Sequence, residues 1–399
     1  MKTFIKDAQV DIVLCSECIT YFNLSLTHID ETGGLKSKNR AKKEESLPTP
    51  TDIFQALNRD VVKQDQAKKA LSIAVAHHYR RLQNPSIGKS NILLIGPTGT
   101  GKTELVRSIV KYLNVPFSSI DASSITAKGY IGEDADSVLR RLLISAKGDV
   151  TRAEGGIVFI DEVDKLARRD GAGGDIGTIA VQQQLLKILE GDKVNIRIPG
   201  EDGRELIVEM DTSKILFICS GAFVGLEKIV NSKSKTMGIM ANIESKTPEV
   251  ATPVYENLKA DHIAEFGLIP EFYGRLPVVT ATESLSIEDL IRILKEPQNS
   301  LTRQYQALFS ADKIELHFHD EFLSEVAAEA VKKGMGARGL RQVLEKRMAK
   351  INFEIGNYKN QRLELCGDNK VLTFPLPVEE VKVPEVVVET GKKLLSKKI

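Results

Sequence analysis

At 399 residues the chain is long enough for two or three domains with cores of their own. Its 55 basic and 54 acidic residues give a net charge of +1, so no overall field favours nucleic acid or membrane surfaces. Four cysteines are too few for a disulfide scaffold, and no apolar run approaches the roughly 20 residues of a membrane span. With an N-terminus that lacks a long apolar stretch, these features predict a cytoplasmic protein.

Residues 1–46 differ in composition from the rest of the chain. Cys15 and Cys18 have the spacing of half a tetrahedral zinc site, and His28 could supply a third ligand, but no fourth ligand is evident. A metal-free pair is therefore the favoured interpretation, and zinc is the alternative. The polar stretch that ends at Glu45 is typical of a flexible linker. A domain start is expected at Leu47, with Thr51 or Asp52 capping a helix.

A glycine-rich stretch carries the first chemical motif. It follows an apolar run at 92–95, expected to be a buried strand, and precedes apolar residues that recur every four positions, as on one face of a helix. A loop in this context points backbone N–H groups at phosphate oxygens. Lys102 would reach the outer phosphates, and the Thr103 hydroxyl would hold Mg²⁺. The loop consists of Gly96, Pro97, Thr98, Gly99, Thr100, Gly101, Lys102 and Thr103. It predicts that the chain binds a nucleoside triphosphate.

Two carboxylates form the second motif. Asp161 and Glu162 directly follow the apolar run 157–160, which places them at the carboxyl edge of a parallel sheet, where ligands of such folds bind. Asp161 would act through Mg²⁺, and Glu162 would position and polarise the attacking water. An apolar strand that ends in Asp-Glu is weak evidence by itself. Sixty residues after a phosphate loop, it indicates a hydrolase.

The remaining pattern alternates strands and helices and then changes. We expect helices at 64–82, 133–147 and 181–190, strands at 115–120 and 215–219, a loop at 168–178, a long turn within 195–204 and an insertion at 231–257. From Ser284 onward helices dominate, and Ser286 with Asp289 forms a capping-box pattern at the start of the first one. We expect two helices within 287–309, one at 320–333 and one from Gly336, with strands at 314–319, 362–366 and 371–374. His317 and His319 alternate on the first of these strands and are interpreted as exposed residues without an acidic partner, in preference to metal ligands.

Taken together, the motifs resemble the ClpX family of AAA+ protein unfoldases over residues 47 to about 374. The resemblance implies an α/β fold: a P-loop domain at 47–283 with a parallel sheet flanked by helices, a smaller and mainly helical α+β domain at 284–374, and a disordered or loosely packed charged tail at 375–399. Its most specific pieces are Leu47-Pro48-Thr49-Pro50, Gln64-x-x-Ala67-Lys68-Lys69, Gly129-Tyr130-Ile131-Gly132-Glu133-Asp134, the run from Asp211 to Cys219, the run from Phe266 to Pro277, and the run from Gly336 to Arg341.

The resemblance also implies roles for single residues. Val61 and Val62 would line the adenine pocket. Arg275 would be an arginine finger that reaches the triphosphate of a neighbouring subunit, which requires a ring and therefore a homohexamer. Arg338 would sense the γ-phosphate from the small domain. Gly129, Tyr130, Ile131 and Gly132 would form a pore loop whose apolar side chains grip a polypeptide without reading its sequence.

The sequence departs from the family's pattern in parts that concern partners. Only one of the family's two zinc-module cysteine pairs is present. The stretch Met237-Gly238-Ile239 matches the loop that docks on the ClpP peptidase but lacks its aromatic residue. Arg204 is followed by Glu205, where the family's second pore loop has a basic cluster. Lys63 replaces a glycine beside the adenine pocket.

The leading hypothesis is an ATP-dependent hexameric protein unfoldase and translocase that uses ATP and Mg²⁺. Its substrates would be unfolded or tagged proteins, and its expected partner is a ClpP-type peptidase. The alternative is a remodelling chaperone that works without a peptidase. A nucleic-acid-directed AAA+ ATPase is a further alternative of a different class, against which the near-neutral charge and the absence of a helix-turn-helix pattern argue.

Overall fold

The computed structural model describes residues 4–6, 13–15, 47–84, 86–126, 134–167, 175–199, 205–236 and 258–376. At its N-terminal end β1 (Phe4–Lys6) and β2 (Val13–Cys15) pair as an antiparallel ribbon. Cys15 is the last residue of β2, and Cys18 lies outside the described residues. Within the described part of the chain, no helix is both long enough and apolar enough to cross a membrane.

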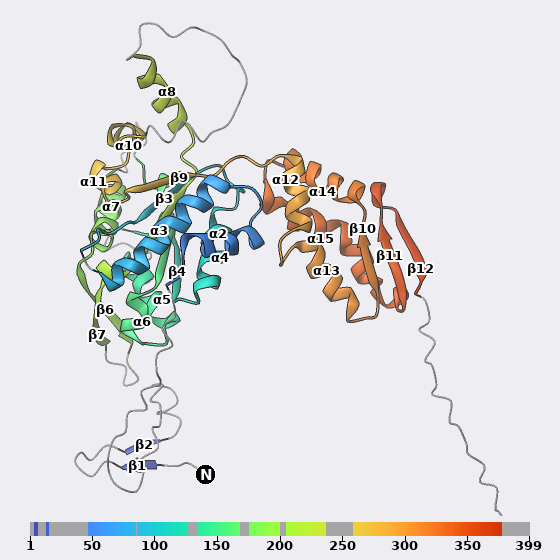
Figure 1. Ribbon diagram of the computed structural model, residues 1–399, viewed down its shortest axis with the longest axis horizontal. Helices are drawn as coiled ribbons and strands as arrows, with labels where there is room; N and C mark the ends of the chain where they lie inside the picture. Colours follow the sequence, from blue (N-terminus) through green and yellow to red (C-terminus); the bar gives the residue numbers. More distant parts are fainter. Residues whose placement is uncertain are drawn as a thin grey trace, which may run out of the picture.

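A parallel five-stranded sheet forms the centre of the larger unit (Figure 1). Its order is β4 (Phe117–Asp121), β5 (Ile157–Asp161), β8 (Leu216–Gly221), β3 (Ile92–Ile95) and β9 (Val278–Ala281). All of β3 and β8 is buried, as expected for strands covered on both faces. The sheet and its helices confirm the α/β fold. The sequence analysis missed β9.

Helices cover both faces because apolar side chains alternate along the strands. Leu94 and Ile218 pack on one side against α2 (Pro50–Asp60), α3 (Asp65–Gln83) and α4 (Lys102–Leu113). Leu93 and Cys219 pack on the other side. That face is covered by α5 (Asp136–Ser145), α6 (Val150–Glu154), α7 (Asp175–Glu190), α8 (Leu226–Thr236), α10 (Ala260–Phe266) and α11 (Pro270–Gly274). Short 3₁₀ turns lie at Ala122–Ser124 (η1), Val163–Leu166 (η2) and Thr212–Lys214 (η3).

Several element boundaries differ from the predicted ones. Residues 195–199 belong to β6 (Lys193–Pro199), which the sequence analysis missed and which pairs antiparallel with β7 (Glu205–Asp211), whereas residues 200–204, which hold most of the predicted turn, lie outside the described residues. One face of this hairpin packs Ile196 and Met210 into the core, and a two-residue alternation over so few residues is easily hidden by a turn signal. Helix α7 begins at Asp175, six residues before the predicted start. The first helix is capped by Thr49 and not by the predicted Thr51 or Asp52, because Pro50 occupies its first turn.

A smaller unit follows at the C-terminal side (Figure 1). The capping box predicted at Ser286 and Asp289 is present. The helices α12 (Ile287–Lys295), α13 (Leu301–Ser310), α14 (Asp320–Lys332) and α15 (Ala337–Phe353) share a separate core with a sheet of order β10 (Glu315–Phe318), β11 (Gln361–Leu365) and β12 (Val371–Pro375). Further 3₁₀ turns lie at Ile355–Tyr358 (η4) and Gly367–Asn369 (η5).

His317 of β10 and His319, the N-cap residue of α14, each have an acidic partner that the sequence analysis did not identify. His317 pairs with Glu315 at 2.8 Å, and His319 pairs with Glu364 at 3.1 Å. Glu364 arrives through the parallel pairing of β10 with β11, which sequence spacing does not show. In the described ranges no group of three or more His, Cys, Asp or Glu side chains is placed to hold a metal ion.

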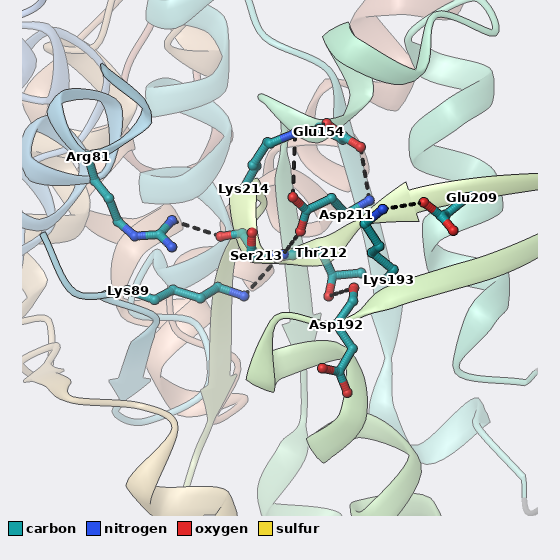
Figure 2. Close-up of polar contacts among 10 residues, drawn as sticks. All are labelled: Arg81, Lys89, Glu154, Asp192, Lys193, Glu209, Asp211, Thr212, Ser213 and Lys214. Carbon is teal, nitrogen blue, oxygen red and sulfur yellow. Dashed lines mark hydrogen bonds and ion pairs between the residues drawn. The ribbon is translucent and has the colours of Figure 1, made fainter. Parts of the chain in front are cut away.

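A polar network fastens the root of the β6–β7 hairpin to the edge of the central sheet (Figure 2). The Lys89 amine donates to the carbonyl oxygens of Thr212 (2.9 Å) and Leu189 (3.1 Å), and it lies 4.6 Å from the centre of the Phe217 ring. Thr212 in turn donates through its backbone N–H and its hydroxyl to the Asp192 carbonyl. Burial, assisted by the nearby Arg81 guanidinium, lowers the pKa of Lys89 to about 7.

This buried amine should make stability depend on pH. An unfolded lysine keeps its proton up to about pH 10.4, whereas folded Lys89 loses it near pH 7, so the unfolded state binds more protons between these values. The free energy of unfolding should therefore rise with pH above 7, by at most about 1.4 kcal/mol per unit. Thermal unfolding at pH 7.0, 7.75 and 8.5 should show this rise, and Lys89→Met should flatten it. Equal pH slopes for the two proteins would contradict the assignment.

Candidate active site

Three glycines of the phosphate loop occupy backbone positions that side chains resist. Gly96, Gly99 and Gly101 have φ of +149°, +81° and +96°. A Cβ on Gly96 would lie 2.1 Å from the Thr282 hydroxyl, and one on Gly99 would lie 2.7 Å from the Met335 carbonyl oxygen. The loop therefore needs glycine both for its turns and for the close approach of neighbouring chain. It ends at α4, whose N-terminus presents free N–H groups.

The Lys102 side chain folds back over the loop. Its amine donates to the carbonyl oxygens of Gly96 (2.5 Å) and Pro97 (2.9 Å). Burial lowers the pKa of Lys102, and the Asp161 carboxylate opposes this effect. The Thr100 hydroxyl also serves the loop itself, since it donates to the Pro97 carbonyl at 2.8 Å. Lys102 thus lies at the loop's phosphate side, while Thr100 and Pro97 hold the loop's shape.

Asp161 is held at the end of β5 by three donors. The Thr103 hydroxyl lies 3.4 Å from Oδ2, the Glu162 N–H lies 2.9 Å from Oδ1, and the Ser220 hydroxyl donates to Oδ1. The Thr103 hydroxyl and the Asp161 carboxylate are oxygen donors that suit Mg²⁺, which usually takes one or two carboxylates and completes its shell with phosphate oxygens and water. The sequence analysis missed Ser220, which is buried at the end of β8, the strand next to β5.

The two carboxylates after Asp161 have different surroundings. Glu162 has a left-handed backbone (φ +59°), and its carboxylate pairs with the Lys165 amine. Asp164 accepts hydrogen bonds from the backbone N–H groups of Ala222 and Phe223, both at 3.2 Å, and so ties η2 to the end of β8. Asp164 is therefore committed to structure, whereas the Glu162 side chain interacts with the half-exposed Lys165 amine and with the Asp121 carboxyl group.

A pocket of about 680 Å³ is lined by part of the predicted nucleotide site; Gly96, Pro97 and Thr100 of the phosphate loop are not among its lining residues. Its lining includes Lys102, Thr103, Asp161 and Glu162 from the larger unit, and Arg338 and Arg341 from α15 of the smaller unit. The Ala337 N–H donates to the Gly99 carbonyl at 3.1 Å, so the N-terminus of α15 rests on the phosphate loop. Arg338 thus lines the same pocket as Lys102, and its predicted role toward the γ-phosphate stays a prediction. Arg341 was not anticipated.

The connection between the two units runs beside the residues predicted for the adenine pocket. Val61 and Val62 are buried but are not among the residues that line the pocket. The buried Gln64 amide donates to the carbonyls of Thr100 and Glu283. Lys63 has φ +59°, in the region that favours glycine, and its amine reaches the Ser284 carbonyl (2.9 Å) and Asp289 (3.0 Å). The glycine-to-lysine departure noted in the sequence therefore adds a polar link to the small unit.

Arg275 lies far from the pocket of its own chain. It precedes β9, which runs parallel to β3, so it stands at the amino edge of the sheet, whereas Gly96 follows β3 at the carboxyl edge. β3 has four residues, which at about 3.3 Å each separates the two edges by roughly 13 Å. The Arg275 guanidinium is half-exposed and pairs with Glu190 at 2.8 Å.

Two predicted sites fall outside the described residues. They are the pore loop Gly129–Gly132 and the tripeptide Met237–Ile239. Of the cysteine pair, the structure describes only the backbone of Cys15.

Known proteins match this chain over most of its length. A family model described as "AAA domain (Cdc48 subfamily)" matches residues 88–279, and one described as "C-terminal, D2-small domain, of ClpB protein" matches residues 285–351. The chain is 38% identical to the ATP-dependent Clp protease ATP-binding subunit ClpX of Treponema denticola, over 93% of this chain and 91% of that relative. It is 41% identical to ClpX 2 of Wolinella succinogenes, over 86% and 85%. The chain therefore belongs to the ClpX family of AAA+ ATPases, which hydrolyse ATP with the help of Mg²⁺.

Proposed function

We propose that this chain is the motor subunit of a cytoplasmic homohexamer that unfolds proteins and threads them through a central pore, with ATP hydrolysed between neighbouring subunits. The division into an ATPase domain at 47–283 and a small domain at 284–374 belongs to this proposal. The observation that carries it is the placement of Arg275 at the sheet edge opposite the phosphate loop. An arginine finger that cannot reach its own triphosphate must act on another subunit's nucleotide, which requires a ring.

Each residue of the site then has a task in hydrolysis. The loop N–H groups and Lys102 bind the phosphates, and Thr103 and Asp161 would hold Mg²⁺, which would supply positive charge to offset the charge that develops on the phosphate oxygens. Ser220 orients Asp161. Glu162 leaves Lys165 to polarise the attacking water, Arg338 contacts the γ-phosphate from the small domain, and the neighbour's Arg275 stabilises the transition state.

Glu162→Gln tests the hydrolytic assignment. The amide cannot act as a general base, so the ATPase rate should fall by about 10²-fold or more while ATP binding changes little. Steady-state hydrolysis and equilibrium binding of ATP measure the two effects. Glu104→Gln is a matched control, because Glu104 is an exposed residue in the first turn of α4 that lines the same pocket, and this variant should keep near-normal turnover. Full activity of Glu162→Gln would exclude Glu162 as the base.

Tyr130 is the proposed grip on the substrate. Tyr130→Ala should preserve ATP hydrolysis and abolish unfolding of a tagged fluorescent protein, because a small side chain cannot press on the polypeptide. Fluorescence loss measured alongside ATPase activity separates the two functions. Tyr112→Ala serves as the control, since Tyr112 is an exposed tyrosine on α4. This variant should unfold the substrate at the normal rate. Unchanged unfolding by Tyr130→Ala would remove the pore loop from the proposal.

The last part of the proposed function concerns the partner that receives the unfolded polypeptide from the pore. The relatives carry the name Clp protease subunit, which favours a ClpP-type peptidase, while the missing aromatic residue in Met237-Gly238-Ile239 favours a chaperone that works alone. If the tripeptide docks, the ring should co-sediment with a ClpP-type peptidase in ATP, and Ile239→Ser should abolish this binding. Absence of binding by the unaltered ring would support the remodelling chaperone.

A further inference from the structure

Asn91, the residue before β3, is a buried asparagine whose side chain holds the backbone of Arg275. It is 2% exposed. Its Nδ2 donates to the Arg275 carbonyl (3.0 Å) and to the Leu189 carbonyl (3.2 Å), and its Oδ1 lies 3.4 Å from the Phe217 N–H. This amide orientation follows from its partners, since carbonyls only accept and a backbone N–H only donates.

The backbone of Asn91 holds the other end of the same segment. Its carbonyl accepts from the Val278 N–H at 3.3 Å, the contact next to the parallel pairing of β3 with β9. The chain from Arg275 to Val278 is therefore fixed at both ends to one residue. Between these ends, Leu276 is buried in the core, so the segment has little freedom to move against β3.

The end of helix α7 completes the arrangement. The Leu189 carbonyl accepts from both Asn91 and Lys89, and the next residue, Glu190, pairs with the Arg275 guanidinium. Lys89 makes its other hydrogen bond to Thr212 at the hairpin root, as Figure 2 shows. Asn91 and Lys89 thus share the Leu189 carbonyl as an acceptor but differ in their other partners. Asn91 also donates to the Arg275 carbonyl, and Lys89 also donates to the Thr212 carbonyl at the hairpin root.

We propose that Asn91 is a positioning residue for the arginine finger. It fixes the position of Arg275 relative to β3, the strand that leads into the phosphate loop of the same subunit. Movement of β3 with one subunit's nucleotide would then shift the guanidinium offered to the neighbour. This inference rests on the proposed function, in which Arg275 acts in trans. Asn91 stands at the opposite end of β3 from the pocket and does not line it, so its effect on its own nucleotide is indirect.

Asn91→Ser and the near-isosteric Asn91→Asp both remove the amide donor. Because a misplacement of about 1 Å can cost about a hundredfold in rate, we expect kcat for ATP to fall about ten- to a hundredfold, with KM changed less than about twofold. Lys89→Met is the matched control, since it loses the bond to the same Leu189 carbonyl but none to Arg275. A raised KM with unchanged kcat would show damage to the phosphate loop and would overturn the proposal.

Mixed rings of full-length subunits separate positioning in trans from misfolding. Arg275→Ala has an intact nucleotide site but no finger, and Glu162→Gln has a finger but no base, so their mixture should recover ATPase activity. An Asn91 variant should likewise recover activity with Glu162→Gln and should recover none with Arg275→Ala, because both partners then lack a working finger. The control variant, Lys89→Met, should show no fall in kcat.

The outcomes test the trans arginine finger and the positioning role of Asn91 separately. If Arg275→Ala and Glu162→Gln fail to restore each other, the trans finger of the proposed function fails. If they do restore each other, but both Asn91 variants recover with Arg275→Ala or fail to recover with Glu162→Gln, the positioning role of Asn91 is wrong and the finger stands.

Discussion

The parallel pairing of β3 with β8 and β9 is the constraint on which the site depends. Because all three strands run in one direction, the chain enters at one edge of the sheet and leaves at the other. Gly96, Asp161 and Ser220 lie at the carboxyl edge, where Asp161 lines the pocket together with residues of α15. Asn91, Lys89 and Arg275 meet at the amino edge. One short buried strand, β3, thereby connects the edge that carries the phosphate loop to the edge that carries Arg275.

Buried polar groups hold each edge in place. At the carboxyl edge, hydroxyls of Thr103 and Ser220 and the N–H of Glu162 satisfy Asp161, which keeps its carboxylate oriented before any ligand arrives. At the amino edge, Asn91 and Lys89 satisfy carbonyls at the ends of α7 and β7 that would otherwise be costly to bury. Such directional bonds specify a single geometry, which apolar packing alone would leave looser.

The link between the two units has a different character. Gly99 and Ala337 meet backbone to backbone, and Lys63 reaches Ser284 and Asp289 from a left-handed position that a glycine would occupy more easily. The Lys63 side chain is 31% exposed, and a partly exposed ionic link of this kind is weaker and more adjustable than the buried hydrogen bonds at the sheet edges. The small unit is therefore joined to the phosphate loop through contacts that can rearrange more easily than the buried hydrogen bonds within the sheet.

The sequence by itself determined the chemistry of the pocket, because the phosphate loop and Asp161-Glu162 are local patterns of strand, turn and charge. It also determined most strands and helices of both units, and through its motifs the family. Only the tertiary structure decided which distant residues meet: Ser220 on Asp161, Glu364 beside His319, the β6–β7 hairpin, and Asn91 on the Arg275 carbonyl. Strand order sets those contacts, and strand order follows from long-range packing that no local pattern encodes.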